Sequence, residues 1–249
     1  MGTLTDIEEQ KRASQRKDEF ISVASHELKT PLSSMKGYIQ LLERSLGKAD
    51  PSYLYVDRTL LQINKLDKLI ADLLDISKIE SGKLKLDRRQ FDFNMLLSNA
   101  IDMMRQTYPS YHFIQKGEAD VIIDGDESRL EQVILNFLSN AVKYSPEIKE
   151  VEIETELLPG KLLEVKIRDF GIGIPKEDQA YVFEKFYRSH QLSRNFQGLG
   201  LGLYISADIM QRHGAEYGVQ SEPGKGSVFF FKLPYIQKHK YTQLLEHEK

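Results

Sequence analysis

The stretch from Phe20 to Leu46 constrains the fold of this chain more than any other part of its sequence. Apolar residues recur there in steps of three and four, which is the period of one face of an amphipathic helix. Pro31 lies inside this pattern, where proline costs about 3 kcal/mol and removes the hydrogen bond that its own amide would give to the Glu27 carbonyl. The pattern predicts a long helix with a local break. Its apolar face consists of Ile21, Ala24, Leu28, Leu32, Met35, Ile39, Leu42 and Leu46.

The pair His26 and Glu27 lies off this apolar face. Thr30 is one turn further on and shares the face of His26. A lone histidine on an amphipathic helix is most often a solvated surface residue. The alternative is a nucleophile whose imidazole the neighbouring carboxylate holds and makes more basic. The helix alone does not decide between these interpretations, so the choice depends on what the remaining chain supplies.

A second helical pattern runs from about Ser52 to Ile79, after Gly47 and the turn residues Asp50 and Pro51. Two long helices joined by a short loop cannot cover their own apolar faces. We therefore expect the hairpin to pair with a second copy as a four-helix bundle. Packing of these faces on the C-terminal part of the chain is the alternative. The second apolar face consists of Val56, Leu60, Ile63, Leu66, Ile70, Leu73, Leu74 and Ile76.

Strands and helices mix after Ile79 to Lys83, a segment that breaks the pattern and that we interpret as a hinge. This mixture predicts an α+β layer, with helices on one face of a mostly antiparallel or mixed sheet. The polar tail after Tyr235 is expected to fray or to be a purification remnant. Strands are predicted at 84–89, 112–116, 120–123, 151–157, 162–169, 217–221 and 227–233, and helices from the N-cap Asp92 to 106, at 128–144 and at 199–213.

The composition narrows the class of protein. The chain has 249 residues, of which 41% are hydrophobic and 29% charged, as in one large or two modest globular domains. It has no cysteine, which excludes disulfides and cysteine-ligated metals, and its net charge of -3 gives no reason to expect nucleic acid as a partner. No apolar run approaches the ~20 residues that span a bilayer, and no signal peptide is visible. We therefore expect the cytoplasm, or the cytoplasmic part of a longer chain.

The predicted helix at 128–144 carries a polar strip of Gln132, Asn136, Asn140 and Lys143. A solvated strip usually consists of Glu and Lys, because Asn is a poor helix former. Two Asn residues one turn apart, followed by Lys, suit a site where neutral oxygens meet a hydrated Mg²⁺ and an ammonium group meets phosphate.

Three glycine-containing stretches follow. Asp169 with Gly171 and Gly173 ends a strand, where the carboxylate could accept a hydrogen bond from an exocyclic amine and the glycines would let a flat ring approach the backbone. Gly198 to Leu203 leads into a helix, an arrangement in which free amides hold phosphate.

Residues 182–197, with Arg188 and Arg194, are interpreted as a mobile lid. Each motif has an ordinary alternative as a turn, and residues 224–227 fit a plain hairpin turn.

The order of these motifs resembles the sensor histidine kinases of two-component systems. The motifs are His-Glu-x-x-Thr-Pro, Asn-x-x-x-Asn, Asp-x-Gly-x-Gly, a Phe-rich box, Gly-x-Gly-x-Gly and Gly-x-Gly-Ser, and the likeness covers roughly residues 17–234. It favours the nucleophile interpretation of His26. The implied chain is multidomain: a lead-in at 1–15, an all-α hairpin at 16–81 that forms a dimeric four-helix bundle for histidine phosphotransfer, an α+β sandwich of the Bergerat type at 82–235 that binds ATP, and a polar tail at 236–249.

The resemblance also implies residue roles. His26 matches the phosphoacceptor, Glu27 its activating neighbour, and Thr30 the position that places water in members with phosphatase activity. Asn140 matches the Mg²⁺ ligand, and Asp169 the adenine-binding carboxylate. The related ATPases typically have Glu where this chain has Asn136, and Asn is no general base. The other residues expected to contact the nucleotide are Asn136, Lys143, Tyr144, Gly171, Gly173, Arg188, Gly198, Leu199, Gly200, Gly202, Leu203 and Ser227, the last a position where the family more often has Thr.

The function implied by the resemblance is ATP-dependent autophosphorylation of His26, then phosphoryl transfer to an aspartate on a response regulator receiver domain. The partners implied are a second copy of the chain, the regulator, which should dock on the bundle below His26, and an upstream sensor, since residues 3–7 resemble the junction after a PAS domain. Three alternatives remain: an ATPase of the same fold that hydrolyses ATP, a scaffold without turnover, and a member that acts mainly as a phosphatase.

Overall fold

The computed structural model of the protein describes residues 28–29, 32–46, 50, 52–187 and 199–238. Its contacts form two compact units, Met1–Lys85 and Leu86–Lys249. The division by contacts falls four residues after the domain boundary that the sequence suggests between residues 81 and 82.

The first unit is a helical hairpin. Residues 32–45 form a helix, and α2 is Tyr53–Glu80. Leu32 is buried together with Ile63 and Ile70 of α2, and Ile39 and Leu74 pack against this cluster. The two predicted helices are therefore confirmed over their described parts. Gly47, Pro51 and the part of the first helix that precedes Leu28 lie outside the described residues.

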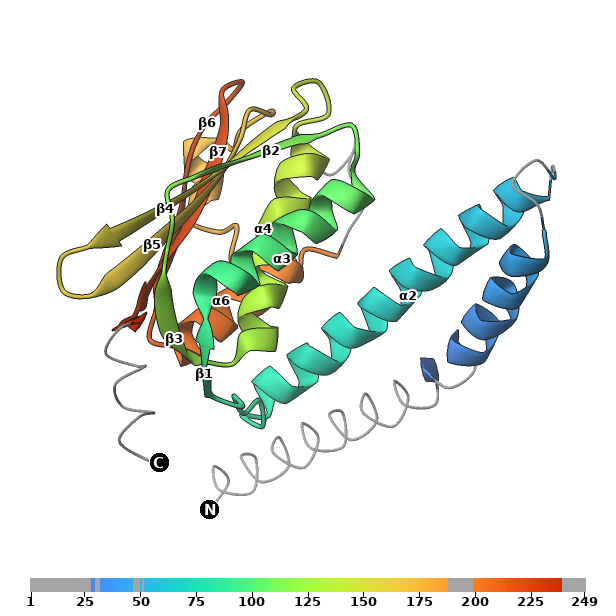
Figure 1. Ribbon diagram of the computed structural model, residues 1–249, viewed down its shortest axis with the longest axis horizontal. Helices are drawn as coiled ribbons and strands as arrows, with labels where there is room; N and C mark the ends of the chain where they lie inside the picture. Colours follow the sequence, from blue (N-terminus) through green and yellow to red (C-terminus); the bar gives the residue numbers. More distant parts are fainter. Residues whose placement is uncertain (1–27, 30–31, 47–49, 51, 188–198, 239–249) are drawn as a thin grey trace, which may run out of the picture. The chain divides into compact units, whose positions relative to one another are not determined.

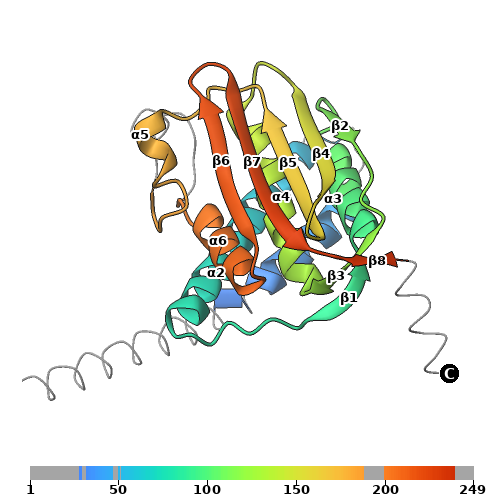
Figure 2. The ribbon, with the colours of Figure 1, turned by 90° about the vertical axis from the view of Figure 1, so that its left-hand side faces the viewer.

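The second unit is an α+β structure, as predicted. Its five-stranded sheet has the order β2-β4-β5-β7-β6, with β2 and β4 parallel and the other pairs antiparallel, and a three-stranded antiparallel sheet has the order β1-β3-β8. Figure 2 shows the larger sheet from its open face, with α3, α4 and α6 behind it. The elements are β1 Arg89–Asp92, α3 Phe93–Thr107, β2 His112–Lys116, β3 Val121–Gly125, α4 Glu127–Tyr144, β4 Glu150–Leu158, β5 Leu162–Asp169, α5 Lys176–Gln179, α6 Gly202–Arg212, β6 Glu216–Glu222, β7 Gly226–Pro234 and β8 Ile236–Gln237.

The core of the second unit lies between the helices and the larger sheet, on the side that Figure 1 shows covered by α3, α4 and α6. The rings of Phe93 and Phe137 contact the ring of Phe231 on β7, at 6.5 and 6.3 Å between centroids. Burial of this face and of its neighbours supplies the main driving force for folding the unit. It also holds α4 against the sheet, with the polar strip turned away from the core. The buried side chains of α4 are Leu130, Val133, Ile134, Phe137, Leu138, Ala141 and Val142.

Two helix starts show how well local signals work. Asp92 was predicted as an N-cap, and its side chain accepts hydrogen bonds from the amides of Asn94 and Met95. The last helix, in contrast, was predicted from Leu199, but α6 begins at Gly202. Gly200 has φ of +70°, which L-residues rarely adopt and which a helix cannot contain. Gly200 therefore belongs to the turn before α6 and not to the helix.

Two strand predictions need correction. The strand predicted at 84–89 is instead β1, Arg89–Asp92, because residues 89–92 are those that find a partner in β3, whereas Lys83 and Leu84 donate back to the carbonyl of Lys78. The tail after Tyr235 was expected to fray. Ile236–Gln237 instead forms β8 on β3, and Lys238 lies 2.7 Å from Asp92 and 2.6 Å from Asp120. Residues 239–249 lie outside the described part.

Candidate active site

The site begins at Asp169, the last residue of β5, whose side chain is 3% exposed. Its Oδ1 atom accepts hydrogen bonds from the backbone amides of Gly171 at 2.9 Å and Ser227 at 3.3 Å. Both bonds go to the same oxygen, so Oδ2 is the atom that remains for an external donor. Burial raises the pKa of Asp169 to about 6, although these two hydrogen bonds and the charge of Arg168 oppose the shift.

Three glycines around Asp169 are required for a reason that the sequence did not show. A Cβ on Gly171 would lie 2.0 Å from the carbonyl oxygen of Tyr144, and one on Gly173 2.1 Å from that of Glu222. A Cβ on Gly226 would lie 2.0 Å from the carbonyl oxygen of Asp169 itself. The space was expected to admit a flat ring. In the structure, other backbone segments occupy it, so the glycines bring β5, α4 and the β6–β7 turn together around the carboxylate.

The polar strip of α4 leads away from this carboxylate. Tyr144, at the C-terminal end of α4, accepts the amide of Ile172 through its carbonyl at 3.2 Å, which places this end beside Asp169. Lys143 donates to the Tyr144 hydroxyl at 3.0 Å, and its ammonium lies 4.6 Å from the centroid of that ring. Asn136 lies eight residues before Tyr144, or about 12 Å along the helix axis. This spacing suits a nucleotide whose base is at Asp169 and whose phosphates are at Asn136.

The far end of the strip meets the N-terminus of α6. Asn136 donates from Nδ2 to the Ser206 hydroxyl at 3.0 Å, and a Cβ on Gly202 would lie 2.5 Å from Asn136 Oδ1. The N-cap of α6, Leu201, makes no side-chain capping bond. The first-turn amides of α6 therefore have no such cap at the point where the helix dipole favours an anion.

The segment predicted as a lid is described only at its beginning. Phe183 packs on Tyr217 and Phe229, with ring centroids 5.0 and 6.2 Å apart. The Tyr187 hydroxyl donates to Asp178 at 2.5 Å, which raises the pKa of Tyr187 to about 12. The Phe186 amide donates to the Gly200 carbonyl at 3.2 Å, which joins the described beginning of the segment to the turn before α6. Arg188, Arg194 and Gly198 lie outside the described residues.

The structure therefore groups many of the predicted site residues and leaves others untested. Asp169, Gly171, Ser227 and Tyr144 meet at one end of α4, and Asn136 and Gly202 at the other. Asn140 and Lys143 lie between these ends on α4, and Gly200, Leu199 and Leu203 flank Gly202 in sequence. His26, Glu27 and Thr30 lie outside the described residues, so their roles stay predictions.

Three polar side chains that support the site were not predicted. Ser221 accepts the Ile174 amide at 2.8 Å and lies 3.0 Å from the Ser227 hydroxyl, and Gln179 donates to the carbonyls of Ile174 and Ser221. Ser206 is the third, 2% exposed on the buried face of α6. A polar residue among apolar neighbours in an amphipathic pattern was the available signal for Ser206.

The residues present fit a metal ion that arrives with its ligand. Among the residues that the structure describes, no cluster of three or more His, Asp or Glu side chains could hold a metal ion on its own. Mg²⁺ is typically bound by one or two protein oxygens together with substrate phosphates. The amide oxygen of Asn140, half-buried on the polar strip of α4, is a donor of that kind.

The raised pKa of Asp169 predicts opposite pH dependences for binding and stability. An amine donor requires the ionised carboxylate, so affinity for an adenine nucleotide should fall as the pH drops below about 6, by about tenfold per pH unit well below it. Because the folded pKa lies above the ordinary 3.8, the contribution of Asp169 to stability is fully present below about pH 4 and is lost as the pH rises through about 6. Calorimetric titration with ADP and thermal unfolding across pH 4–7 measure both. Asp169→Asn is the control and should remove both dependences; persistence of either in this variant would assign it to another group.

The comparisons with known proteins cover both units. The family model "His Kinase A (phospho-acceptor) domain" matches residues 16–82, and "Histidine kinase-, DNA gyrase B-, and HSP90-like ATPase" matches residues 125–237. The first match includes His26, Glu27 and Thr30, and the second includes α4, Asp169 and the glycine-rich turn before α6.

Individual relatives agree with these matches. Sensor histidine kinase WalK of Bacillus subtilis (strain 168) is 34% identical over 245 residues, which are 96% of this chain and 40% of WalK. Sensor histidine kinase RcsC of Escherichia coli (strain K12) is 36% identical over 237 residues, 90% of this chain and 24% of RcsC. The crystal structure of full-length ShkA in complex with AMPPNP has a TM-score of 0.69 at 26% identity, and covers 87% of this chain and 46% of ShkA. The chain thus spans less than half the length of each of these relatives.

Proposed function

This chain belongs to the sensor histidine kinases, of which it holds the phosphoacceptor domain and the ATPase domain, and on that premise we propose that it transfers the γ-phosphoryl group of ATP to His26 and then to a response regulator. The observation that carries the proposal is the site along α4, where a buried carboxylate at one end and a neutral amide at the other suit binding of a nucleotide without hydrolysis. Asn136 is not a base at neutral pH, so it does not activate water. The site is suited to present the γ-phosphate to an external nucleophile.

In the proposed first step, a ring nitrogen of neutral His26 attacks the γ-phosphorus. The bond between that phosphorus and the β–γ bridging oxygen breaks, ADP leaves with the electron pair, and the imidazole proton passes to solvent or to Glu27. In the second step an aspartate oxygen of the regulator attacks the same phosphorus, the P–N bond breaks with its electron pair on nitrogen, and that nitrogen takes up a proton from solvent or from Glu27, which restores His26. Protein side chains contribute mainly by positioning and charge neutralisation in such transfers.

We propose the nucleotide contacts that the geometry of the site supports. Asp169 Oδ2 would accept from the adenine amine, the Lys143 ammonium would neutralise phosphate charge, and the α6 N-terminus would bind phosphate oxygens. Asn140 would hold Mg²⁺ through its amide oxygen, and the ion would supply charge neutralisation at the phosphates. Gly198 and Arg188 are proposed for the same phosphate side on the resemblance alone.

A homodimer is proposed from the apolar side chains that the hairpin leaves uncovered. In the first helix Leu32 and Ile39 pack on α2, whereas Leu28, Met35 and Leu42, spaced seven residues apart, are 55%, 50% and 46% exposed. A heptad spacing is typical of a helix that packs on a further helix. Light scattering should therefore give twice the chain mass of 28.7 kDa; a monomer at micromolar concentration would contradict the four-helix bundle. On α2 the exposed leucine side chains are those of Leu54, Leu61, Leu66 and Leu73.

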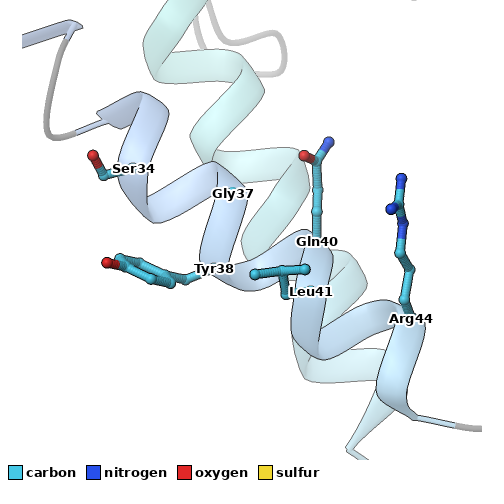
Figure 3. A pocket seen from close by; sticks show the side chains of 6 residues that line it. All are labelled: Ser34, Gly37, Tyr38, Gln40, Leu41 and Arg44. Carbon is cyan, nitrogen blue, oxygen red and sulfur yellow. The ribbon is translucent and has the colours of Figure 1, made fainter.

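The response regulator is proposed to dock on a different face of the same helix. Figure 3 shows the side chains that project from this face, on which Tyr38 is 73% and Leu41 63% exposed. Gly37, eleven residues after His26, returns to the face of His26 by the helical period. A regulator seated there would bring its aspartate near the phosphohistidine. The hollow on this face is lined by Ser34, Gly37, Tyr38, Gln40, Leu41 and Arg44.

Tyr38→Ala should slow phosphoryl transfer to the regulator by about 30-fold, the effect of losing a central aromatic contact worth about 2 kcal/mol. Autophosphorylation should stay unchanged, because Tyr38 belongs to the helical hairpin and is not among the residues proposed to bind the nucleotide. Tyr55→Ala is the matched control, since Tyr55 is 71% exposed on α2. Rapid-quench assays with the cognate receiver domain measure both steps. Equal transfer rates for the two variants would place the docking surface elsewhere.

Three rival functions have their own tests. A same-fold ATPase would release inorganic phosphate continuously and retain no label, so the ratio of protein-bound label to free phosphate in a single turnover separates it from the kinase. A chain that acts mainly as a phosphatase would remove phosphate from a pre-phosphorylated regulator, and Thr30→Ala would abolish this without affecting autophosphorylation. A non-enzymatic scaffold would fail to bind nucleotide.

The wider setting of the chain is also a proposal. An upstream PAS-like sensor is proposed from residues 3–7, and a cytoplasmic location from the family. None of the helices in the described ranges is long and apolar enough to cross a membrane.

A further inference from the structure

Asn136 and Ser206 meet where α4 packs on α6, although 70 residues separate them in the sequence. The Ser206 hydroxyl accepts the Asn136 Nδ2 hydrogen bond at 3.0 Å, and Ser206 is 2% exposed. Water therefore has little access to replace this partner. On its other side the amide faces the bare Cα of Gly202, since a Cβ there would lie 2.5 Å from Asn136 Oδ1.

We propose that Ser206 is a positioning residue: its hydroxyl fixes the side-chain torsions of Asn136 so that the amide stays against Gly202, at the N-terminus of α6 where the phosphates bind. This rests on the proposed function, which places the phosphates there. Without the hydroxyl, the amide would lose its described partner and could rotate about its side-chain bonds. Ser206 would thus act on the nucleotide through Asn136 and not by direct contact.

The surroundings of Ser206 support a role beyond packing. Its neighbours Ile205, Ala207, Ile209 and Met210 are all buried and apolar, and a hydroxyl among them costs free energy unless it is hydrogen-bonded. Alanine would fit the same space without that cost, and it is also a better helix former. If Ser206 only filled space, its substitution would not alter the Asn136 side chain. If Ser206 positions Asn136, the effects of substituting the two residues are not additive.

The first test observes the hydrogen bond itself, independently of activity. The Asn136 side-chain NH₂ signals are identified in a ¹⁵N–¹H correlation spectrum by their loss in Asn136→Ala. Ser206→Ala should shift these signals and speed their exchange with water. Ser139→Ala is the matched control, because the Ser139 hydroxyl donates only to the backbone carbonyl of Asn136, at 3.1 Å. Unchanged Asn136 signals in Ser206→Ala would overturn the proposal.

The second test is a double-mutant cycle on the affinity for Mg²⁺-AMPPNP, measured by calorimetry. Ser206→Ala should weaken binding about three- to tenfold in the wild-type background and have no further effect in Asn136→Ala. Ser206→Cys nearly conserves the volume but is a poor acceptor, so it should behave like Ser206→Ala if the hydrogen bond and not a cavity is responsible. Equal weakening in both backgrounds would show that Ser206 does not act through Asn136. Absence of phosphohistidine in the wild type would contradict the proposed function but leave both tests readable.

Discussion

Gly226→Ala should destabilise the ATPase unit by about 2–5 kcal/mol and abolish nucleotide binding. Gly226 has φ of +92°, a conformation that costs an L-residue about 1–2 kcal/mol. In addition, its new Cβ would lie 2.0 Å from the carbonyl oxygen of Asp169. Relief of that contact requires movement of backbone, and overpacking of this kind costs about 1–3 kcal/mol or more. The strand end that carries Asp169, the carboxylate proposed to bind adenine, would therefore move.

The β6–β7 turn offers a matched control two residues away. Gly224 also has a positive φ, of +76°, but nothing lies within 4 Å of a Cβ built on it. Gly224→Ala should therefore show the conformational cost alone, about 1–2 kcal/mol, and keep nucleotide affinity. Thermal unfolding and calorimetric titration with ADP measure the two variants. Equal losses of stability and binding would mean that the contact with Asp169 has no role of its own.

Asp169→Asn should weaken ADP binding by about 10- to 100-fold, the range for a hydrogen bond to a charged group worth about 1.5–3 kcal/mol. The amides of Gly171 and Ser227 would keep the asparagine oxygen at the Oδ1 position. The NH₂ group would then occupy the Oδ2 position and face the amine of adenine, so that two donors oppose each other.

The same geometry predicts a change of base preference. Inosine diphosphate presents an acceptor oxygen where ADP presents its amine, so Asp169→Asn should bind it better than ADP, and the wild type should prefer ADP. Calorimetric titration of the wild type and of Asp169→Asn, each with ADP and with inosine diphosphate, measures this preference. A variant that retained the wild-type preference for ADP would show that Asp169 does not contact the exocyclic group of the base.

The fold could be predicted from the sequence wherever a local signal determined it. The polar strip of Gln132, Asn136, Asn140 and Lys143, repeated at helical spacing, indicated α4, whose bounds begin one residue before the predicted start. The predicted strands at 151–157 and 162–169, with Pro159 and Gly160 between them, are likewise the β4–β5 hairpin of the structure. Strand β8 had no such signal: Ile236 and Gln237 are strand residues because they pair with β3, more than 110 residues earlier in the chain, and no periodicity shows such a pairing.

The sequence indicated which residues belong to the site, but not which contacts each of them makes. Asp169 was expected to bind a base, and nothing in the sequence showed that both its backbone hydrogen bonds go to one oxygen. Gly171 was expected to leave room for a ligand, whereas the space at its Cα is taken by the Tyr144 carbonyl. Such contacts join segments distant in sequence, so a motif reports that a glycine is needed without saying what approaches it.

The central claim is that His26 receives the γ-phosphoryl group of ATP, and the most direct measurement locates that group. The chain is incubated with γ-labelled ATP and Mg²⁺, and the label is tested for acid and alkali stability and mapped to the tryptic peptide 18–29, in which His26 is the sole histidine. We predict acid-labile, alkali-stable label on this peptide in the wild type and none in His26→Gln. Label that persists at the wild-type rate in His26→Gln, or bound nucleotide without any label in the wild type, would contradict the claim.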